Sequence, residues 1–330
     1  MKKLYILTFL SLSSLVFSQK IEKLFNEEKY AELTSLERES NNFTNQELYY
    51  LGFAFFRQEN DLKAIDYYNK ALEKGFDHSE LFFQKGLSEI FLKKYDDALA
   101  DFNTAISKNS MAEYYIEKAR VYIITKDVLN EEKTYTEGLL KAQKKDDRWY
   151  LQLLKNAGNF YYTQTKNFSK SEKIYADGIA KFPKSYELYE KRIKALNAED
   201  RFIEADGIFD QLQNLYAKKL LSEEYMKFKN VAVDEFSWNG QWINIYKSFE
   251  KPKEMLDSLY KVYLIDKTGE KVERKFNIEK TIQVEKKDPE FVICEEINNG
   301  HRTYPVGFKN GNFRITELRK EITKILNNKK

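Results

Sequence analysis

Residues 45–78 read NQELYYLGFAFFRQENDLKAIDYYNKALEKGFDH, and residues 79–112 read SELFFQKGLSEIFLKKYDDALADFNTAISKNSMA. The second segment repeats the apolar and small residues of the first at a shift of 34 positions. The matching pairs are Leu48 and Phe82, Gly52 and Gly86, Ala64 and Ala98, Tyr68 and Phe102, Ala71 and Ala105, and Leu72 and Ile106. Self-similarity at a fixed spacing of about 20–50 residues is typical of repeat architectures. The 34-residue register therefore predicts one.

Each repeat is expected to contain two helices. Residues 46–58 carry apolar side chains at helical spacing, and Thr44 followed by Glu47 matches the capping box that begins many helices. A second apolar stripe runs from about Asp61 to Lys74. Because Gly52 is small where the two helices must approach, the second helix can place a large ring beside it.

The motif of the first copy resembles the tetratricopeptide repeat (TPR), whose unit is a helix-turn-helix of this length. It consists of Leu48, Leu51, Gly52, Phe55, Ala64 and Tyr68. The resemblance implies a stack of helix pairs in which neighbouring repeats complete the core. Further copies are expected from Ser79, Ala112, about Leu151 and about Ser185, between an N-terminal cap at residues 21–40 and a capping helix at residues 220–236. The second copy departs from the motif at Lys85 and Glu89.

The first eighteen residues have the pattern of a secretory signal. Lys2 and Lys3 precede an apolar run from Leu4 to Phe17, and Ser18 suits a cleavage site. The run is shorter than the roughly twenty residues that span a membrane. No Cys lies near the expected cleavage site, so no lipid anchor is expected. The high Lys, Asn, Phe and Tyr content resembles that of exported proteins of Gram-negative Bacteroidota, so we expect a periplasmic or secreted protein after cleavage near Ser18.

The helical spacing of apolar residues ends near Ser237, and the sequence has the pattern of β-strands from Ser258 to Phe308. Two hairpins are expected, residues 259–265 with 271–282 and residues 291–297 with 303–308, followed by a final helix with Ile315, Leu318 and Ile322 on one face. The predicted organisation is a signal peptide at 1–18, a TPR solenoid at 19–236 and a small α+β region with an antiparallel sheet and a C-terminal helix at 237–330. The fold class is therefore mainly α.

Composition excludes several functions. With 55 Lys and Arg against 52 Asp and Glu, no strong field for nucleic acid or an anionic membrane is expected. Cys294 is the only cysteine and His78 and His301 are the only histidines, so we expect neither a disulfide nor a metal site, and no cofactor. Phosphate-loop, nucleophile-elbow and zinc-helix motifs do not occur in the sequence. The chain is therefore expected not to be an enzyme, although a loop with His301, Arg302, Tyr304 and Glu295 is left open as an enzymatic alternative.

The TPR resemblance implies a binding groove lined by the first helix of each repeat. The partner-binding residues carried over from the motif are Tyr49, Tyr50, Phe53, Phe56 and Arg57 in the first copy, Phe83, Gln84 and Leu87 in the second, and Ile116 and Arg120 in the third. The same motif positions also include Gln46, Glu80, Ile90, Phe91, Glu113, Glu117, Ile123 and Ile124. Aromatic residues at helical spacing also suit a core, so burial decides between core and groove.

The leading hypothesis is an exported scaffold that binds a helix or an extended segment of a protein partner, as part of a bacterial envelope assembly. Chaperone-tail binding is disfavoured because Tyr49 and Phe53 stand where a carboxylate clamp has Lys and Asn. The alternative is capture of a glycan or nutrient, for which related envelope proteins use exposed aromatic residues on similar helices.

Overall fold

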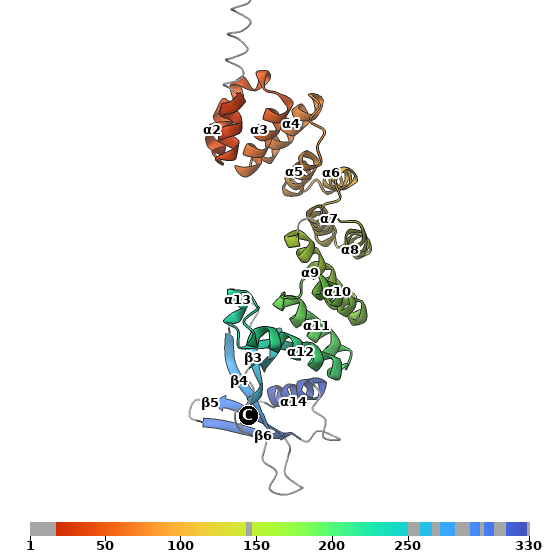
Figure 1. Ribbon diagram of the computed structural model, residues 1–330, viewed down its shortest axis with the longest axis vertical. Helices are drawn as coiled ribbons and strands as arrows, with labels where there is room; N and C mark the ends of the chain where they lie inside the picture. Colours follow the sequence, from red (N-terminus) through yellow and green to blue (C-terminus); the bar gives the residue numbers. More distant parts are fainter. Residues whose placement is uncertain are drawn as a thin grey trace, which may run out of the picture. The chain divides into compact units, whose positions relative to one another are not determined.

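The computed structural model describes residues 18–142, 147–249, 258–265, 271–280, 291–297, 300–306 and 315–328 (Figure 1). Residues 1–17 of the expected signal segment and the turn at residues 266–270 lie outside this part. The chain forms two compact units, Met1–Leu153 and Leu154–Lys330, called here the N-terminal and the C-terminal unit. The division falls within helix α9 (Asp147–Thr163).

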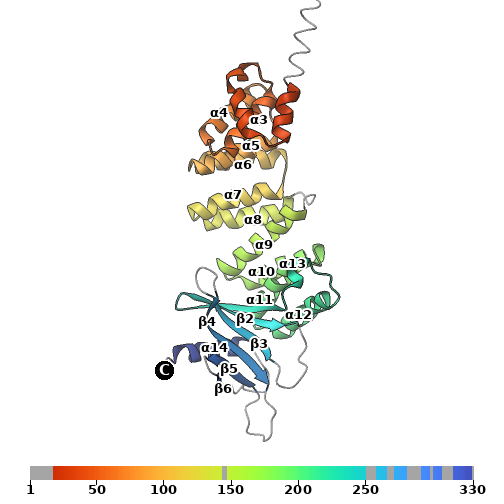
Figure 2. The same ribbon diagram turned by 90° about the vertical axis from the view of Figure 1, so that its left-hand side faces the viewer.

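The N-terminal unit consists of helix pairs, as the repeat predicts. The pairs are α3 (Asn45–Arg57) with α4 (Asp61–Glu73), α5 (Ser79–Phe91) with α6 (Tyr95–Lys108), and α7 (Ala112–Thr125) with α8 (Val128–Lys141). Residues 18–26 are helical and precede α2 (Tyr30–Ser35) and the 3₁₀-helix η1 (Leu36–Asn42), which cap the first pair. Figure 2 shows the pairs in chain order.

Local signals begin and end these helices. Thr44 and Glu47 form the predicted capping box, in which the Glu47 N–H donates to Thr44 Oγ1 at 3.3 Å and the Thr44 N–H donates to Glu47 Oε2 at 2.7 Å. The turn inside each pair contains one left-handed residue, at Glu59, Lys93 and Lys126, each with φ 59°. Each is the fifteenth residue counted from the start of its first helix, so the turn recurs with the repeat.

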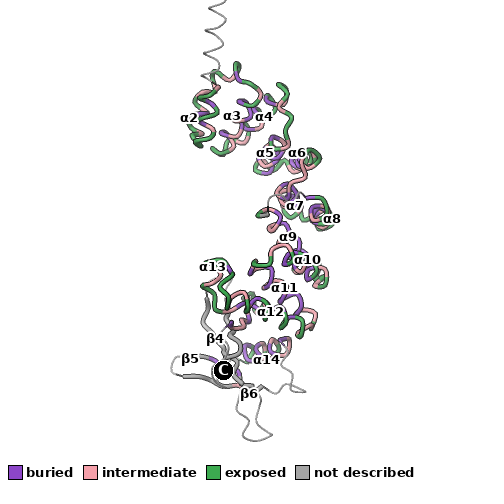
Figure 3. Tube along the Cα trace, viewed as in Figure 1, coloured by how far each residue is buried: buried purple, intermediate pink, exposed green. Residues whose placement is uncertain are grey.

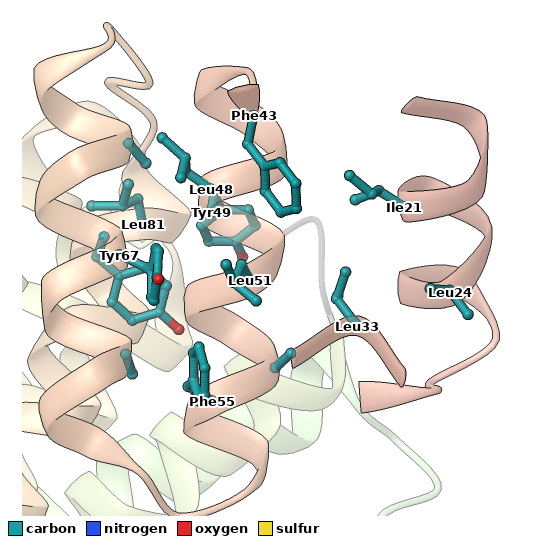
Figure 4. Packing of buried hydrophobic residues seen from close by; sticks show 14 residues of the cluster. Ile21, Leu24, Leu33, Phe43, Leu48, Tyr49, Leu51, Phe55, Tyr67 and Leu81 are labelled. Carbon is teal, nitrogen blue, oxygen red and sulfur yellow. The ribbon is translucent and has the colours of Figure 1, made fainter. Parts of the chain in front are cut away.

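Small residues lie beneath rings in the first two pairs, as expected. A Cβ on Gly52 would lie 2.8 Å from the Tyr68 ring, and one on Gly86 would lie 2.9 Å from the Phe102 ring. Both distances are shorter than van der Waals contact, so only glycine permits this approach. Figure 4 shows the core of the first pair, in which Leu48 and Leu51 of α3 share one cluster with Leu81 of α5 and with Ile21, Leu24 and Leu33 of the N-terminal cap.

The motif departures in the second copy form a buried ionic cluster. Lys85 Nζ lies 2.9 Å from Asp101 Oδ2 and 3.5 Å from Glu89 Oε1. Burial, and next the charge of Asp101, raise the pKa of the Glu89 carboxyl to about 8. The cluster therefore favours the protonated form of the Glu89 carboxyl.

The C-terminal unit combines helices with a sheet. Its helices are α10 (Phe168–Lys181), α11 (Tyr186–Ala198), α12 (Phe202–Ala217), α13 (Glu223–Met226) and α14 (Ile315–Asn327). Its six strands are β1 (Asn230–Trp238), β2 (Gln241–Ser248), β3 (Ser258–Ile265), β4 (Lys271–Lys280), β5 (Phe291–Ile297) and β6 (Gly300–Val306). Neighbours in sequence pair antiparallel, in the order β1 to β6. The expected fold class, repeated helix pairs followed by an antiparallel sheet and a C-terminal helix, is confirmed.

The helix expected at residues 220–236 is wrong. Only α13 is helical there, and β1 begins at Asn230 and crosses the boundary expected at residue 237. Strands β1 and β2 form a further hairpin, whose turn residues Asn239 and Gly240 have φ 48° and 77°. Asn-Gly is a strong signal for a two-residue hairpin turn. It indicates that a strand precedes residue 239, so the sheet region begins upstream of the expected boundary at residue 237. The two predicted hairpins, β3 with β4 and β5 with β6, are confirmed.

A buried ion pair joins the C-terminal helix to the first strand. The Arg319 guanidinium of α14 donates to both carboxylate oxygens of Asp234 in β1, with Arg319 Nε at 2.9 Å from Asp234 Oδ2. The Asp234 side chain is fully buried. Although Arg319 lowers the pKa of this carboxyl, burial is the larger effect and the pKa is raised.

Replacing Arg319 alone should destabilise the protein strongly. In Arg319→Met, Asp234 is left buried and unpaired, which costs about 3–5 kcal/mol of unfolding free energy. Urea unfolding would measure the loss. The double variant Asp234→Ala/Arg319→Met removes both charges and is expected to lose less than Arg319→Met alone. An equal or greater loss in the double variant would contradict this role for the pair.

The Glu89 cluster should make stability depend on pH. Because the folded pKa is raised above its ordinary value of 4.5, the contribution of Glu89 is full below pH 4.5 and is lost as the pH rises toward 8, at up to about 1.4 kcal/mol per pH unit. Glu89→Gln resembles the protonated acid and should remove this slope from the unfolding free energy measured between pH 5 and 9. Glu73→Gln, at an exposed carboxyl of α4, is the matched control. Because the raised pKa of Asp234 adds a slope of its own, the comparison is with the unmodified protein: an equal slope with and without Glu89→Gln would contradict the raised pKa of Glu89.

Candidate interaction surface

Three of the predicted groove residues belong to the core. Tyr49, Phe83 and Gln84 are buried. The Tyr49 ring stacks on Phe76 with ring centroids 4.9 Å apart, and the Phe83 ring stacks on Tyr114 at 4.6 Å. These side chains therefore fix helices to one another, and the expectation that they face a partner is corrected. The rings that cover Tyr49 and Phe83 are Phe76, in the loop before α5, and Tyr114 of α7. The repeat motif alone does not predict these contacts.

The N-terminal cap covers much of the first copy. The Phe25 ring stacks on Tyr50 at 4.0 Å and meets Phe53 edge-on at 5.4 Å. Tyr30 also contacts Phe53, and the Arg57 guanidinium lies 5.3 Å from the centre of the Tyr30 ring. Tyr50 and Phe53 are therefore half-buried, and Arg57 is exposed at their edge.

Three exposed apolar residues lie near the C-terminal ends of α5 and α7. Phe91 is 60% exposed, Ile123 51% and Ile124 44%. Helices α3, α5 and α7 lie side by side, and the Phe56 ring of α3 lies 6.2 Å from Phe91. Leu87 and Ile116 are half-buried. Figure 3 shows buried and exposed residues alternating along these helices. We call the set Leu87, Phe91, Ile116, Ile123 and Ile124 the apolar patch.

Carboxylates lie at the opposite ends of the same helices. Glu80 is exposed and accepts hydrogen bonds from Tyr114 Oη at 3.2 Å and from Gln84 Nε2 at 2.8 Å. Burial, followed by the effects of Ser79 and Glu80, leaves the pKa of Tyr114 raised to about 12, so Tyr114 remains a donor. In α7, Glu117 forms an ion pair with Arg120 at 2.6 Å, and Glu113 is the second residue of the helix. The surface of α5 and α7 thus changes from acidic to apolar along the helices.

In the C-terminal unit, the chain itself occupies the corresponding side of α11. Asn197 Nδ2 donates to the Val233 carbonyl of β1 at 2.8 Å, and Tyr186 Oη donates to the Asn230 carbonyl at 3.0 Å. Val233 is skipped in the β1–β2 register, and Asn197 supplies a donor to its carbonyl. Lys194 pairs with Glu235 of β1 at 2.7 Å. Strand β1 therefore binds along α11 through polar side chains.

Of the residues left open as an enzymatic alternative, Glu295 contacts Tyr304 and lies opposite Arg302 in the β5–β6 register. Tyr304 Oη donates to the buried Glu295 carboxylate at 2.7 Å. His301 lies in strand β6, opposite Glu296 of β5, and not in the loop expected from the sequence. His78 is exposed beside Phe76, and Cys294 is buried. Within the described ranges, no three His, Cys, Asp or Glu side chains are placed to hold a metal ion.

A cavity beside Asn197 and Val233 measures about 20 Å³, room for about one water molecule.

None of the helices in the described part of the chain is long and apolar enough to cross a bilayer. No protein-family profile and no curated protein matches the chain.

The structure is similar to the C-terminal part of a TPR repeat-containing protein from Cytophaga hutchinsonii, with a TM-score of 0.51 and 15% sequence identity, over 63% of this chain and 82% of that chain. A tetratricopeptide repeat protein from Parabacteroides merdae aligns over 61% of this chain and 82% of its own, with a TM-score of 0.41 and 19% identity. Identities this low establish the fold alone. The chain therefore has a TPR-like fold.

Proposed function

We propose that this chain is an exported TPR scaffold that binds a segment of a protein partner on the surface formed by α5 and α7 in the N-terminal unit. The observation that carries the proposal is the apolar patch. Its exposed members stand on two helices that lie side by side, and exposed apolar surface bordered by polar residues marks interaction sites. Here Glu80 and Glu113 lie toward the other ends of the helices that carry the patch.

The patch also stands on rigid supports. Phe83 and Ile90 of α5 are buried against neighbouring helices, so Leu87 and Phe91 project from a helix that is fixed in place. In α7, Tyr115 and Ala119 are fully buried and hold Ile123 and Ile124 in the same way. A preorganised surface lowers the entropy cost of binding, which suits a scaffold.

Two features support export and a role without catalysis. Lys2 and Lys3 followed by an apolar run have the pattern of a signal that is removed near Ser18, which favours the periplasm and an envelope assembly. The surface that carries the patch consists of apolar side chains and charged groups, of which Glu117 and Arg120 form an ion pair with each other. Binding of a partner is a sufficient role for these residues, and the proposal therefore assigns no catalysis to them.

Photo-cross-linking in intact cells tests the scaffold. With a photoreactive phenylalanine analogue in place of Phe91 or Ile124, irradiation should yield a discrete protein adduct that mass spectrometry identifies. The same analogue at Leu140 or Ile203, which are 80% and 90% exposed on α8 and α12, should not yield that adduct.

Adducts that are absent at both patch positions, or identical at the patch and control positions, would contradict the scaffold proposal. The recovered protein also tests export, because its N-terminus should be Gln19. A mature chain that still begins at Met1 would contradict export, while leaving the assigned surface to the cross-linking result.

A further inference from the structure

The chain contains its own example of an extended segment bound along a repeat helix. Strand β1 lies on α11 and receives hydrogen bonds from Asn197 and Tyr186 to two of its backbone carbonyls. An extended segment has backbone N–H and C=O groups that need partners when they leave water. Binding a strand on such a surface therefore requires polar side chains like these.

The equivalent positions in the N-terminal unit are mostly apolar. Counted from the first residue of its helix, Asn197 is the twelfth residue of α11, and the twelfth residues of α3, α5 and α7 are Phe56, Ile90 and Ile123. None of these three side chains can bond to a backbone carbonyl. The ninth position, Lys194 in α11, is held by Phe53, Leu87 and Arg120.

The amides near this surface are already engaged within it. Gln84 is buried and donates to Glu80 at 2.8 Å, and Gln46 Nε2 donates to Tyr50 Oη at 2.6 Å. Arg120 is ion-paired with Glu117. The surface of α5 and α7 thus offers apolar area in place of the polar contacts that hold β1 on α11.

A helix has no such requirement, because its backbone groups bond to one another. It needs only an apolar stripe that packs on Leu87, Phe91, Ile123 and Ile124, with its remaining side chains in water. Helix-on-helix packing is also how α5 and α7 meet each other in this unit. The apolar patch therefore fits a helical segment better than an extended one.

Charge adds a second requirement on the partner. Glu80 is exposed, and the hydrogen bonds that it accepts come from the neutral groups of Tyr114 and Gln84, so its negative charge is left for a ligand. Lysine or arginine beside the apolar stripe of a bound helix would meet the Glu80 carboxylate.

We infer that the segment bound on α5 and α7 is an amphipathic α-helix with basic residues beside its apolar stripe. This inference rests on the proposed scaffold function and goes further by naming the conformation and charge of the partner segment.

Three labelled peptides of equal length test it on the full chain by fluorescence anisotropy. The first is a Leu/Lys peptide with leucines at helical spacing, the second has the same composition in strict alternation and favours a strand, and the third is the helical design with Glu in place of Lys. The helical Leu/Lys peptide should bind at least tenfold more tightly than either of the others.

Variants assign the binding to the surface. Phe91→Ser/Ile124→Ser should weaken binding of the helical peptide at least fivefold, and Glu80→Gln should weaken it about twofold. Leu140→Ser, at a more exposed apolar site on α8, should leave it unchanged. All of these side chains are solvent-accessible, and an unchanged circular dichroism melting curve verifies the fold of each variant.

Tighter binding of the alternating peptide at the same residues would overturn the helical partner and leave the scaffold standing. Binding that ignores Phe91→Ser/Ile124→Ser, or no binding of the helical peptide, would also overturn the inference. Failure of the scaffold itself is read separately, from the absence of cross-links at Phe91 and Ile124 in cells.

Discussion

The close approach of two helices, with a small residue beneath an aromatic ring, is the constraint on which the rest of the structure depends. Gly52 lies under Tyr68 and Gly86 under Phe102, and a Cβ on either glycine would intrude into the ring. In the C-terminal unit, Gly158 lies under Tyr175 in the same way. Because one side of each first helix is pressed against its partner, the remaining sides are left for neighbouring repeats and for binding.

That orientation explains how repeats of one type can present different surfaces. On α11 the outward positions carry Lys194 and Asn197, and strand β1 of the same chain binds there. On α5 the same two positions carry Leu87, which is half-buried, and Ile90, which is buried, and the exposed Phe91 follows them. The repeat fixes where these side chains stand, and their chemistry decides what they bind. The buried cluster of Lys85, Glu89 and Asp101 shows that the core positions also accept polar residues when charges are paired.

Local spacing was enough to predict the helix pairs, the Thr44 capping box and the two downstream hairpins, because each depends on residues close together in sequence. Burial of the groove aromatics could not be predicted in this way. Tyr50 is covered by Phe25, and Phe83 by Tyr114, and these partners lie on other helices. The helix expected where β1 begins is wrong because the contacts that hold this strand, to α11 and α14, are long-range, and only the Asn239-Gly240 turn signals the strand locally.

A double-mutant cycle at Gly52 and Tyr68 tests the packing constraint most directly. Alanine normally stabilises a helix interior over glycine by about 0.5–1 kcal/mol, but here its Cβ would lie 2.8 Å from the Tyr68 ring, so Gly52→Ala should lower the unfolding free energy by about 1–3 kcal/mol. In the Tyr68→Leu background the ring is gone, and the same substitution should be neutral or stabilising. Equal effects of Gly52→Ala in the two backgrounds, measured by urea unfolding, would contradict the claim that the ring requires glycine at this position.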